Sequence, residues 1–132
     1  MILKAILEPI RAVWVSCRHA GRGVLFAARC QRNFRLHLLA AAAVFISAVA
    51  FHFDWLEMAL VVLTVSMVIL GELLNTALEY TLNLLEARSH PVVRAAKDIA
   101  AGGVLLCVLG SIGVGILLFG PHLWAFFMRA RG

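Results

Sequence analysis

Three glutamates and two asparagines recur at helical spacing after residue 71. Read as an α-helix at about 100° per residue, they fall within roughly 80° of one another: Glu72, Asn75, Glu79, Asn83 and Glu86. Glu72 has apolar neighbours on both sides, and an acid at membrane depth is costly and rare, so it is a candidate functional residue. Apart from Asp98, every acid in the second half of the chain lies on this acidic stripe.

The acidic stripe suits phosphoryl transfer to a membrane alcohol. At 1.5 Å per residue, Glu72 lies roughly 22 Å beyond Glu57 and Glu79 about 10 Å further still, which places them near the lipid headgroups. A carboxylate there can take a proton from a lipid hydroxyl, and one further out can bind a hard divalent cation. Lys97 and Arg94 add positive charge for phosphate oxygens. Positioning and charge neutralisation are what phosphoryl transfer mainly needs.

Ordinary structural roles are open to most of these residues, and Glu72, with apolar neighbours on both sides, is the hardest to explain in this way. A solvated helix face is the commoner role for a single helical acid such as Glu79 or Glu86. Asn75 suits an interhelical hydrogen bond, and Lys97 and Asp98 suit a charge pair at a helix start. The sequence contains neither a GxxxxGK[ST] loop nor a protein-kinase glycine-rich pattern, so a nucleotide would be held without those folds.

The composition indicates one membrane domain spanning residues 1–132. The chain is 63% hydrophobic with a net charge of +5 and a mean hydropathy of +0.95, which is unusual for a soluble domain. Its positive residues flank apolar runs, which favours an anionic membrane surface over nucleic acid, and no nucleic-acid recognition motif is present. The three cysteines show no metal or disulfide spacing, and we expect no cleavable signal peptide.

We therefore expect an all-α membrane protein with an N-terminal amphipathic surface helix and three transmembrane helices. Apolar and basic stripes predict the surface helix over residues 9–33, with Pro9 in its first turn. Apolar runs predict membrane helices over 36–53, 56–86 and 92–119, and Pro121 is expected to end the last of them.

The distribution of positive charge predicts the topology. Ten of the twelve Lys and Arg residues lie in the N-terminal region up to Arg35 or in the loop region 88–97. The positive-inside rule then places the N-terminus and that loop in the cytoplasm and the C-terminus outside.

The acidic stripe also carries a resemblance to a known family. Residues 72–79, ELLNTALE, resemble the ExxNxAxE signature of the prokaryotic integral-membrane diacylglycerol kinase and undecaprenol kinase family, and residues 90–102, HPVVRAAKDIAAG, resemble its second block. His19-Ala-Gly-Arg-Gly23 and Arg32-Asn-Phe34 are similar to the undecaprenol kinase branch in particular. The resemblance covers roughly residues 15–120.

The resemblance implies ATP-dependent phosphorylation of a lipid hydroxyl at the cytoplasmic face of the bacterial inner membrane, by a homotrimer with sites shared between neighbours. It implies Mg²⁺ or another divalent cation, with undecaprenol favoured over diacylglycerol as acceptor. Glu72 would be the catalytic base and contact the lipid, with Asn75 supporting it. The resemblance further implies that Glu79 binds the metal and its nucleotide, that His90, Lys97 and Asp98 contact the nucleotide, and that Arg35 lies near the lipid entry.

One position departs from the family pattern. The family has a metal-binding glutamate just before the Arg-Asn-Phe block, and this chain has Gln31. Glutamine keeps an oxygen ligand and loses the charge, which should weaken metal binding. A catalytically weak or inactive structural membrane protein is therefore the alternative to an active kinase. An ion-coupled carrier fits poorly, because the first span offers few polar groups.

Overall fold

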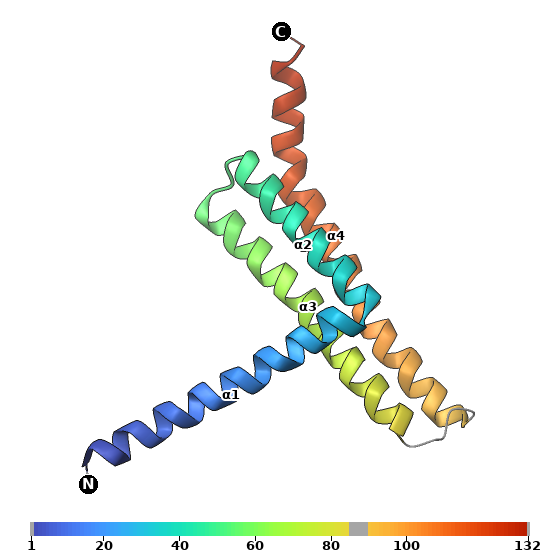
Figure 1. Cartoon of the computed structure of the whole chain (residues 1–132). Coiled ribbons are helices and arrows are strands. Elements are labelled where there is room, and N and C mark those ends of the chain that lie inside the picture. The colour runs from blue at the N-terminus through green and yellow to red at the C-terminus, as the bar shows by residue number, and fades with distance from the viewer. Residues whose placement is uncertain (1, 85–89, 132) are drawn as a thin grey trace.

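The computed structural model describes residues 2–84 and 90–131. It contains four helices, α1 (Ile2–Cys30), α2 (Arg32–Ala50), α3 (Trp55–Leu84) and α4 (Pro91–Arg129). The last three form a bundle, and α1 leaves it at a steep angle with its N-terminal end far from the other helices (Figure 1). Helices α2, α3 and α4 are each long and apolar enough to cross a membrane. The predicted fold class is thus confirmed.

The helix boundaries differ from the predicted ones in two informative places. α1 begins at Ile2 and carries Pro9 inside it, whereas the prediction put this proline in the first turn. α4 continues through Pro121 to Arg129, ten residues past the expected end at Phe119. Proline removes one backbone hydrogen bond and bends a helix without always ending it, and half of residues 122–129 are good helix formers. Glu86 and the predicted end of the second span lie outside the described residues.

The corner between α1 and α2 is built around Gln31. Its extended backbone, with φ −106° and ψ 118°, separates the two helices, and the Arg35 guanidinium donates from Nη1 to the Arg29 carbonyl at 2.9 Å. Arg35 thereby satisfies a carbonyl that the end of α1 leaves open. Phe34 is completely buried close by in the chain, and Phe26 of α1 meets Tyr80 of α3 edge to face at 5.3 Å. These contacts hold the C-terminal end of α1 against the bundle.

The turn between α2 and α3 uses paired capping motifs. His52 has φ 55°, and the amides of His52 and Phe53 donate to the carbonyls of Val49 and Ala48, which is a Schellman motif. The Asp54 carboxylate then accepts from the Glu57 amide at 2.8 Å, and Glu57 accepts from the Asp54 amide at 2.9 Å. This reciprocal pair is a capping box that fixes the start of α3.

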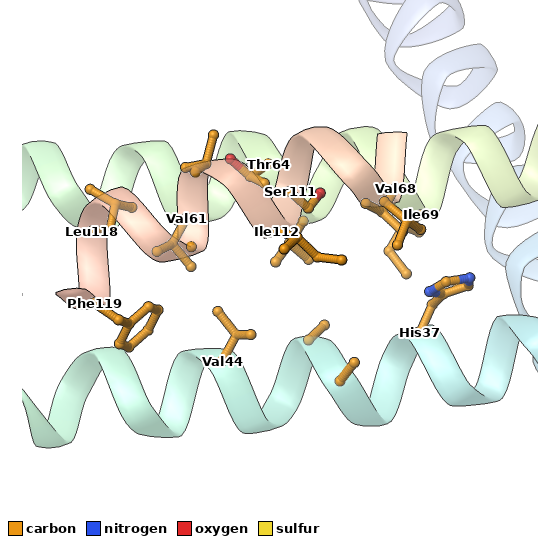
Figure 2. A pocket seen from close by; sticks show the side chains of 16 residues that line it. His37, Val44, Val61, Thr64, Val68, Ile69, Ser111, Ile112, Leu118 and Phe119 are labelled. Atoms are coloured by element: carbon orange, nitrogen blue, oxygen red, sulfur yellow. The ribbon is translucent and has the colours of Figure 1, made fainter. Parts of the chain in front are cut away.

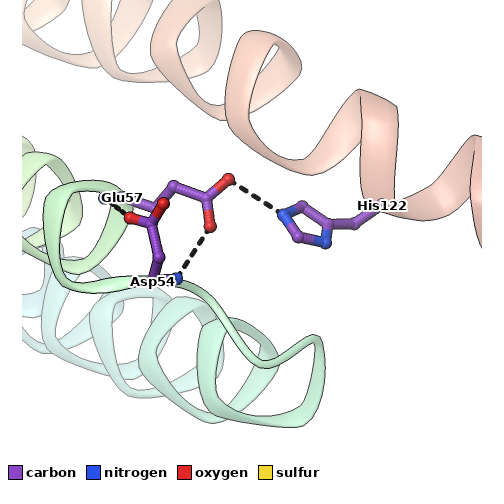
Figure 3. A network of polar contacts seen from close by, with 3 residues as sticks. All are labelled: Asp54, Glu57 and His122. Atoms are coloured by element: carbon purple, nitrogen blue, oxygen red, sulfur yellow. Dashed lines mark hydrogen bonds and ion pairs between the residues drawn. The ribbon is translucent and has the colours of Figure 1, made fainter.

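Glu57 also joins the start of α3 to α4. Its second carboxylate oxygen lies 2.9 Å from Nε2 of His122 on α4 (Figure 3). The His122 ring stacks on Phe53 with centroids 4.8 Å apart. One carboxylate therefore caps a helix and ties the two longest helices together at the end of the bundle opposite the acidic stripe.

Close packing joins α3 and α4 along their length. A Cβ added at Gly71 would lie 3.5 Å from Sγ of Cys107 and 3.9 Å from Cα of Val104. Small residues at such points let two membrane helices approach each other closely. The approach matters because Glu72 directly follows Gly71 on α3.

Replacing Glu57 with alanine should lower the free energy of unfolding by about 1–2 kcal/mol, because the α3 cap and the His122 contact are lost together. Unfolding in mixed detergent micelles, followed by circular dichroism, measures this. The matched control is Glu8→Ala, which removes an exposed acid from α1 and should change stability little. A Glu57→Ala protein as stable as the control would contradict the assigned role.

Candidate functional site

Glu72 is buried on the face of α3 that turns into the bundle. Only 4% of the residue is exposed, and Thr76, one turn further along, is buried as well. Burying a carboxylate costs free energy unless other groups pair with it. A buried acid in a membrane protein is therefore a candidate for a functional role. Among the described residues, no group forms a hydrogen bond to the Glu72 carboxyl. No fully buried side-chain oxygen in these residues lacks a hydrogen-bond partner. The carboxyl oxygens of Glu72 are therefore not fully enclosed.

The next three residues of the acidic stripe face α4. Asn75, Glu79 and Asn83 are each half-buried on α3. Asn83 accepts a hydrogen bond from Nζ of Lys97 at 2.7 Å, which fixes the lysine against the stripe. The two sequence blocks that were predicted to act together therefore meet across the α3–α4 interface.

A hollow of about 220 Å³ lies where these blocks meet. Its walls come from α3 and from the first turns of α4; the residues that line it are Asn75, Leu78, Glu79, Lys97, Asp98, Ala100 and Ala101. We call it the Asn75–Lys97 hollow. It places two carboxylates, one amide and one ammonium group around a single small space. Such a set can hold a cation and the phosphate oxygens that the cation carries.

His90 occupies the N-cap position of α4. Its Nδ1 accepts from the Val92 amide at 3.3 Å, and Pro91 follows at the first helical position. Because Nδ1 accepts, the ring proton of the neutral form is assigned to Nε2. An exposed N–H donor therefore stands beside the positive end of the α4 dipole, which favours an anion. The predicted nucleotide contact of His90 stays a prediction.

Gln31 and Arg35 lie away from this hollow. Both belong to the α1–α2 corner, and neither lines the space between α3 and α4. Within residues 2–84 and 90–131, no group of three or more His, Cys, Asp and Glu side chains could hold a metal ion. Mg²⁺ does not require such a cage, since it commonly binds one or two carboxylates plus substrate phosphates and water. Glu79 and Asp98, with Asn75 beside them, fit that mode.

A larger cavity, of about 330 Å³, opens between α2, α3 and α4 (Figure 2). Its walls are almost wholly apolar, and His37, Thr64 and Ser111 are the polar side chains that reach them. The two hydroxyls already donate to the carbonyls of Leu60 and Cys107 within their own helices. This space suits hydrocarbon and offers no acid for catalysis, so the smaller polar hollow is the better candidate site.

Sequence reasoning did not single out two features that adjoin site residues in the chain. Thr76 is buried one turn from Glu72, and its place on the same helical face was the available signal. The contact between Phe26 and Tyr80 sets α1 against α3, and nothing in the sequence pattern pairs those two rings.

Similarity to known proteins covers most of the chain. Residues 18–119 match the family described as prokaryotic diacylglycerol kinase. The undecaprenol kinase of Bacillus subtilis (strain 168) is 41% identical over 105 residues, which make up 80% of this chain and 85% of that protein. A diacylglycerol kinase of Synechocystis sp. is 42% identical over 110 residues, 83% of this chain and 63% of that protein. Both regions found on opposite sides of the hollow lie inside the matched range.

Proposed function

The chain belongs to the prokaryotic diacylglycerol kinase family, and from this premise we propose that it transfers the γ-phosphate of ATP to the hydroxyl group of a membrane lipid. The observation that carries the proposal is the meeting of Asn75 and Glu79 with Lys97 and Asp98 around one hollow. Glu72 is buried one to two turns deeper along α3. A polyphosphate and a lipid hydroxyl can then approach each other from opposite sides of the headgroup layer.

The reaction assigns a task to each residue. Glu72 accepts the proton of the lipid hydroxyl as its oxygen forms a bond to the γ-phosphorus. The bond from that phosphorus to the β–γ bridging oxygen breaks, and ADP leaves with the electron pair. Lys97, which Asn83 holds in place, and the Nε2–H of His90 stabilise charge on the phosphate oxygens. Asn75 orients the groups at the base of the hollow.

A divalent cation, which we propose to be Mg²⁺, supplies neutralisation of the ATP phosphates when it is bound. Glu79 is the residue proposed to hold it, with Asp98 facing it from α4 and contacting the nucleotide. The hard oxygens of these side chains suit Mg²⁺.

We propose undecaprenol as the preferred acceptor, with diacylglycerol next. The support is the similarity of His19–Gly23 and Arg32–Phe34 to the undecaprenol kinase branch, together with the relative of that name. Arg35, at the α1–α2 corner, is proposed to lie near the lipid entry. Apolar side chains of α2, α3 and α4 can surround the hydrocarbon chains of either lipid.

The proposed setting is one domain in the bacterial inner membrane, with the N-terminus in the cytoplasm. The excess of Lys and Arg in residues 4–35 and 88–97 supports this orientation. We also propose a homotrimer with shared sites. Within one chain, α3 and α4 line the hollow, and Gln31 and Arg35 lie outside it. This arrangement is expected if a neighbouring subunit completes the site.

Replacing Glu72 with glutamine should lower lipid-dependent ATP turnover by about 10²–10⁴-fold, because the general base is lost while the buried volume is kept. The assay couples ADP release to added lipid in bilayers containing Mg²⁺, with undecaprenol and diacylglycerol compared side by side. Glu8→Gln, the same change at an exposed acid on α1, is the matched control and should keep turnover within about twofold. Full activity of Glu72→Gln would remove Glu72 from the role of base.

The alternative function is a catalytically weak or inactive family member that serves as a structural membrane protein. One observation favours weighing it, which is that Gln31 stands where the family has a metal-binding glutamate. An inactive protein of this kind would show no turnover with either lipid at any Mg²⁺ concentration, whereas a weak kinase would show turnover at high Mg²⁺.

Changing Gln31 to glutamate separates the two functions. For a weakened kinase, the restored charge should lower the Mg²⁺ needed for half-maximal turnover by about tenfold, the lower end of what partners in a metal site contribute. Cys30→Asp adds the same charge at the exposed neighbouring position and should not have this effect. Turnover in neither the native chain nor Gln31→Glu would support the structural alternative.

A further inference from the structure

The last turns of α4 extend past the rest of the bundle. In Figure 1 the C-terminal end of α4 continues beyond the turn between α2 and α3, with no other helix beside it. Residues 121–131, which we call the C-terminal segment, also lie outside the family match at 18–119. The family match therefore does not explain the role of this segment, which we infer from its own residues.

Helix length sets the depth of the C-terminal segment. At 1.5 Å per residue, residues 99–119 span about 31 Å, close to the ~30 Å hydrocarbon core of a bilayer. Residues 120–129 add about 15 Å, roughly twice the thickness of one headgroup layer. A helix standing upright would thus lift its last turns into water. Either a tilt of α4 or a bend at Pro121 keeps them in the headgroup layer.

The side chains of the segment make a stay in water unfavourable. Four large apolar residues fall within an arc of about 140°, and Trp124 and Phe127 are 70% and 59% exposed; the four are Leu123, Trp124, Phe127 and Met128. His122 lies on the opposite side of the helix and faces Glu57 within the bundle. The apolar arc therefore faces away from the protein, and aromatic side chains in this position are typical of the membrane–water interface.

The charge of the segment identifies the chemistry that fits it. The segment contains Arg129 and Arg131, and no Asp or Glu follows Asp98 in the sequence. An apolar arc beside arginines is the pattern of a helix that lies in an interface and binds anionic lipid. A second copy of the chain would bring like charges together at this place, which opposes such a contact.

We propose that residues 121–131 form a membrane anchor that binds anionic phospholipid in the leaflet opposite the Asn75–Lys97 hollow. Leu123, Trp124, Phe127 and Met128 enter the boundary between headgroups and acyl chains. The guanidinium groups of Arg129 and Arg131 reach back to the lipid phosphates, since long basic side chains extend toward the interface. This anchor is independent of the proposed kinase reaction.

A full-length chain with Trp14→Phe and Trp55→Phe keeps Trp124 as its single tryptophan and reports on the segment. It is reconstituted into phosphatidylcholine vesicles with and without phosphatidylglycerol. Brominated lipids report the depth of Trp124, and acrylamide reports its contact with water. With phosphatidylglycerol present, Trp124 should be quenched by bromine close to the headgroups and shielded from acrylamide.

Replacing Arg129 and Arg131 with glutamine should reverse the shielding. Each arginine near an anionic surface shifts the balance between the inserted and the water-exposed segment by roughly fivefold, and both together by about twenty-five-fold. The matched control, Arg11→Gln with Arg18→Gln, removes the same charge from α1 and should leave Trp124 unchanged.

Three results would overturn the anchor. The first is equal acrylamide quenching of Trp124 with and without phosphatidylglycerol. The second is a double arginine variant that behaves like the control. The third is shielding that is already complete in lipid-free detergent and is lost on dilution, which would mean that a second copy covers the apolar arc.

Discussion

Glu72 carries a carboxylate into a bundle whose other buried side chains are apolar or bear a hydroxyl. Removing an acid from water costs free energy that packing around it does not return. The helices must therefore leave a path by which substrate approaches the carboxylate oxygens. They must also place other reactive groups near those oxygens. Gly71, one residue earlier, allows α3 and α4 to approach closely, and the polar hollow lies just beyond that point of contact.

The two ends of the α3–α4 pair have different roles, one in stability and one in the candidate site. At one end Glu57 combines a capping box with a contact to His122, so a single acid fixes a helix start and a helix pair. At the other end Lys97 reaches Asn83 across the same interface. A stable far end lets the polar end hold charged groups without losing register, because the helices between them are packed along their length.

The sequence predicted the architecture well because membrane helices reveal themselves by length and apolar content. The helical spacing of Asn75 and Glu79 also placed them correctly on one face of α3. Other features depend on tertiary contacts that no spacing encodes. The edge-to-face contact of Phe26 with Tyr80 and the pairing of Glu57 with His122 join residues far apart in the chain. The extension of α4 past Pro121 depended on whether a proline bends or ends a helix.

Ligand entry into the Asn75–Lys97 hollow tests the account most directly. In a chain whose native cysteines are alanine, Ala101→Cys places a thiol on the wall of the hollow, and Ala130→Cys places one at the far end of α4. In detergent, Mg²⁺-ATP at ten times its Kd should slow modification of the thiol at position 101 about tenfold, because bound ligand leaves the hollow open only about a tenth of the time. The thiol at position 130 should react at an unchanged rate. Unslowed modification at position 101 while the protein demonstrably binds ATP would contradict the account.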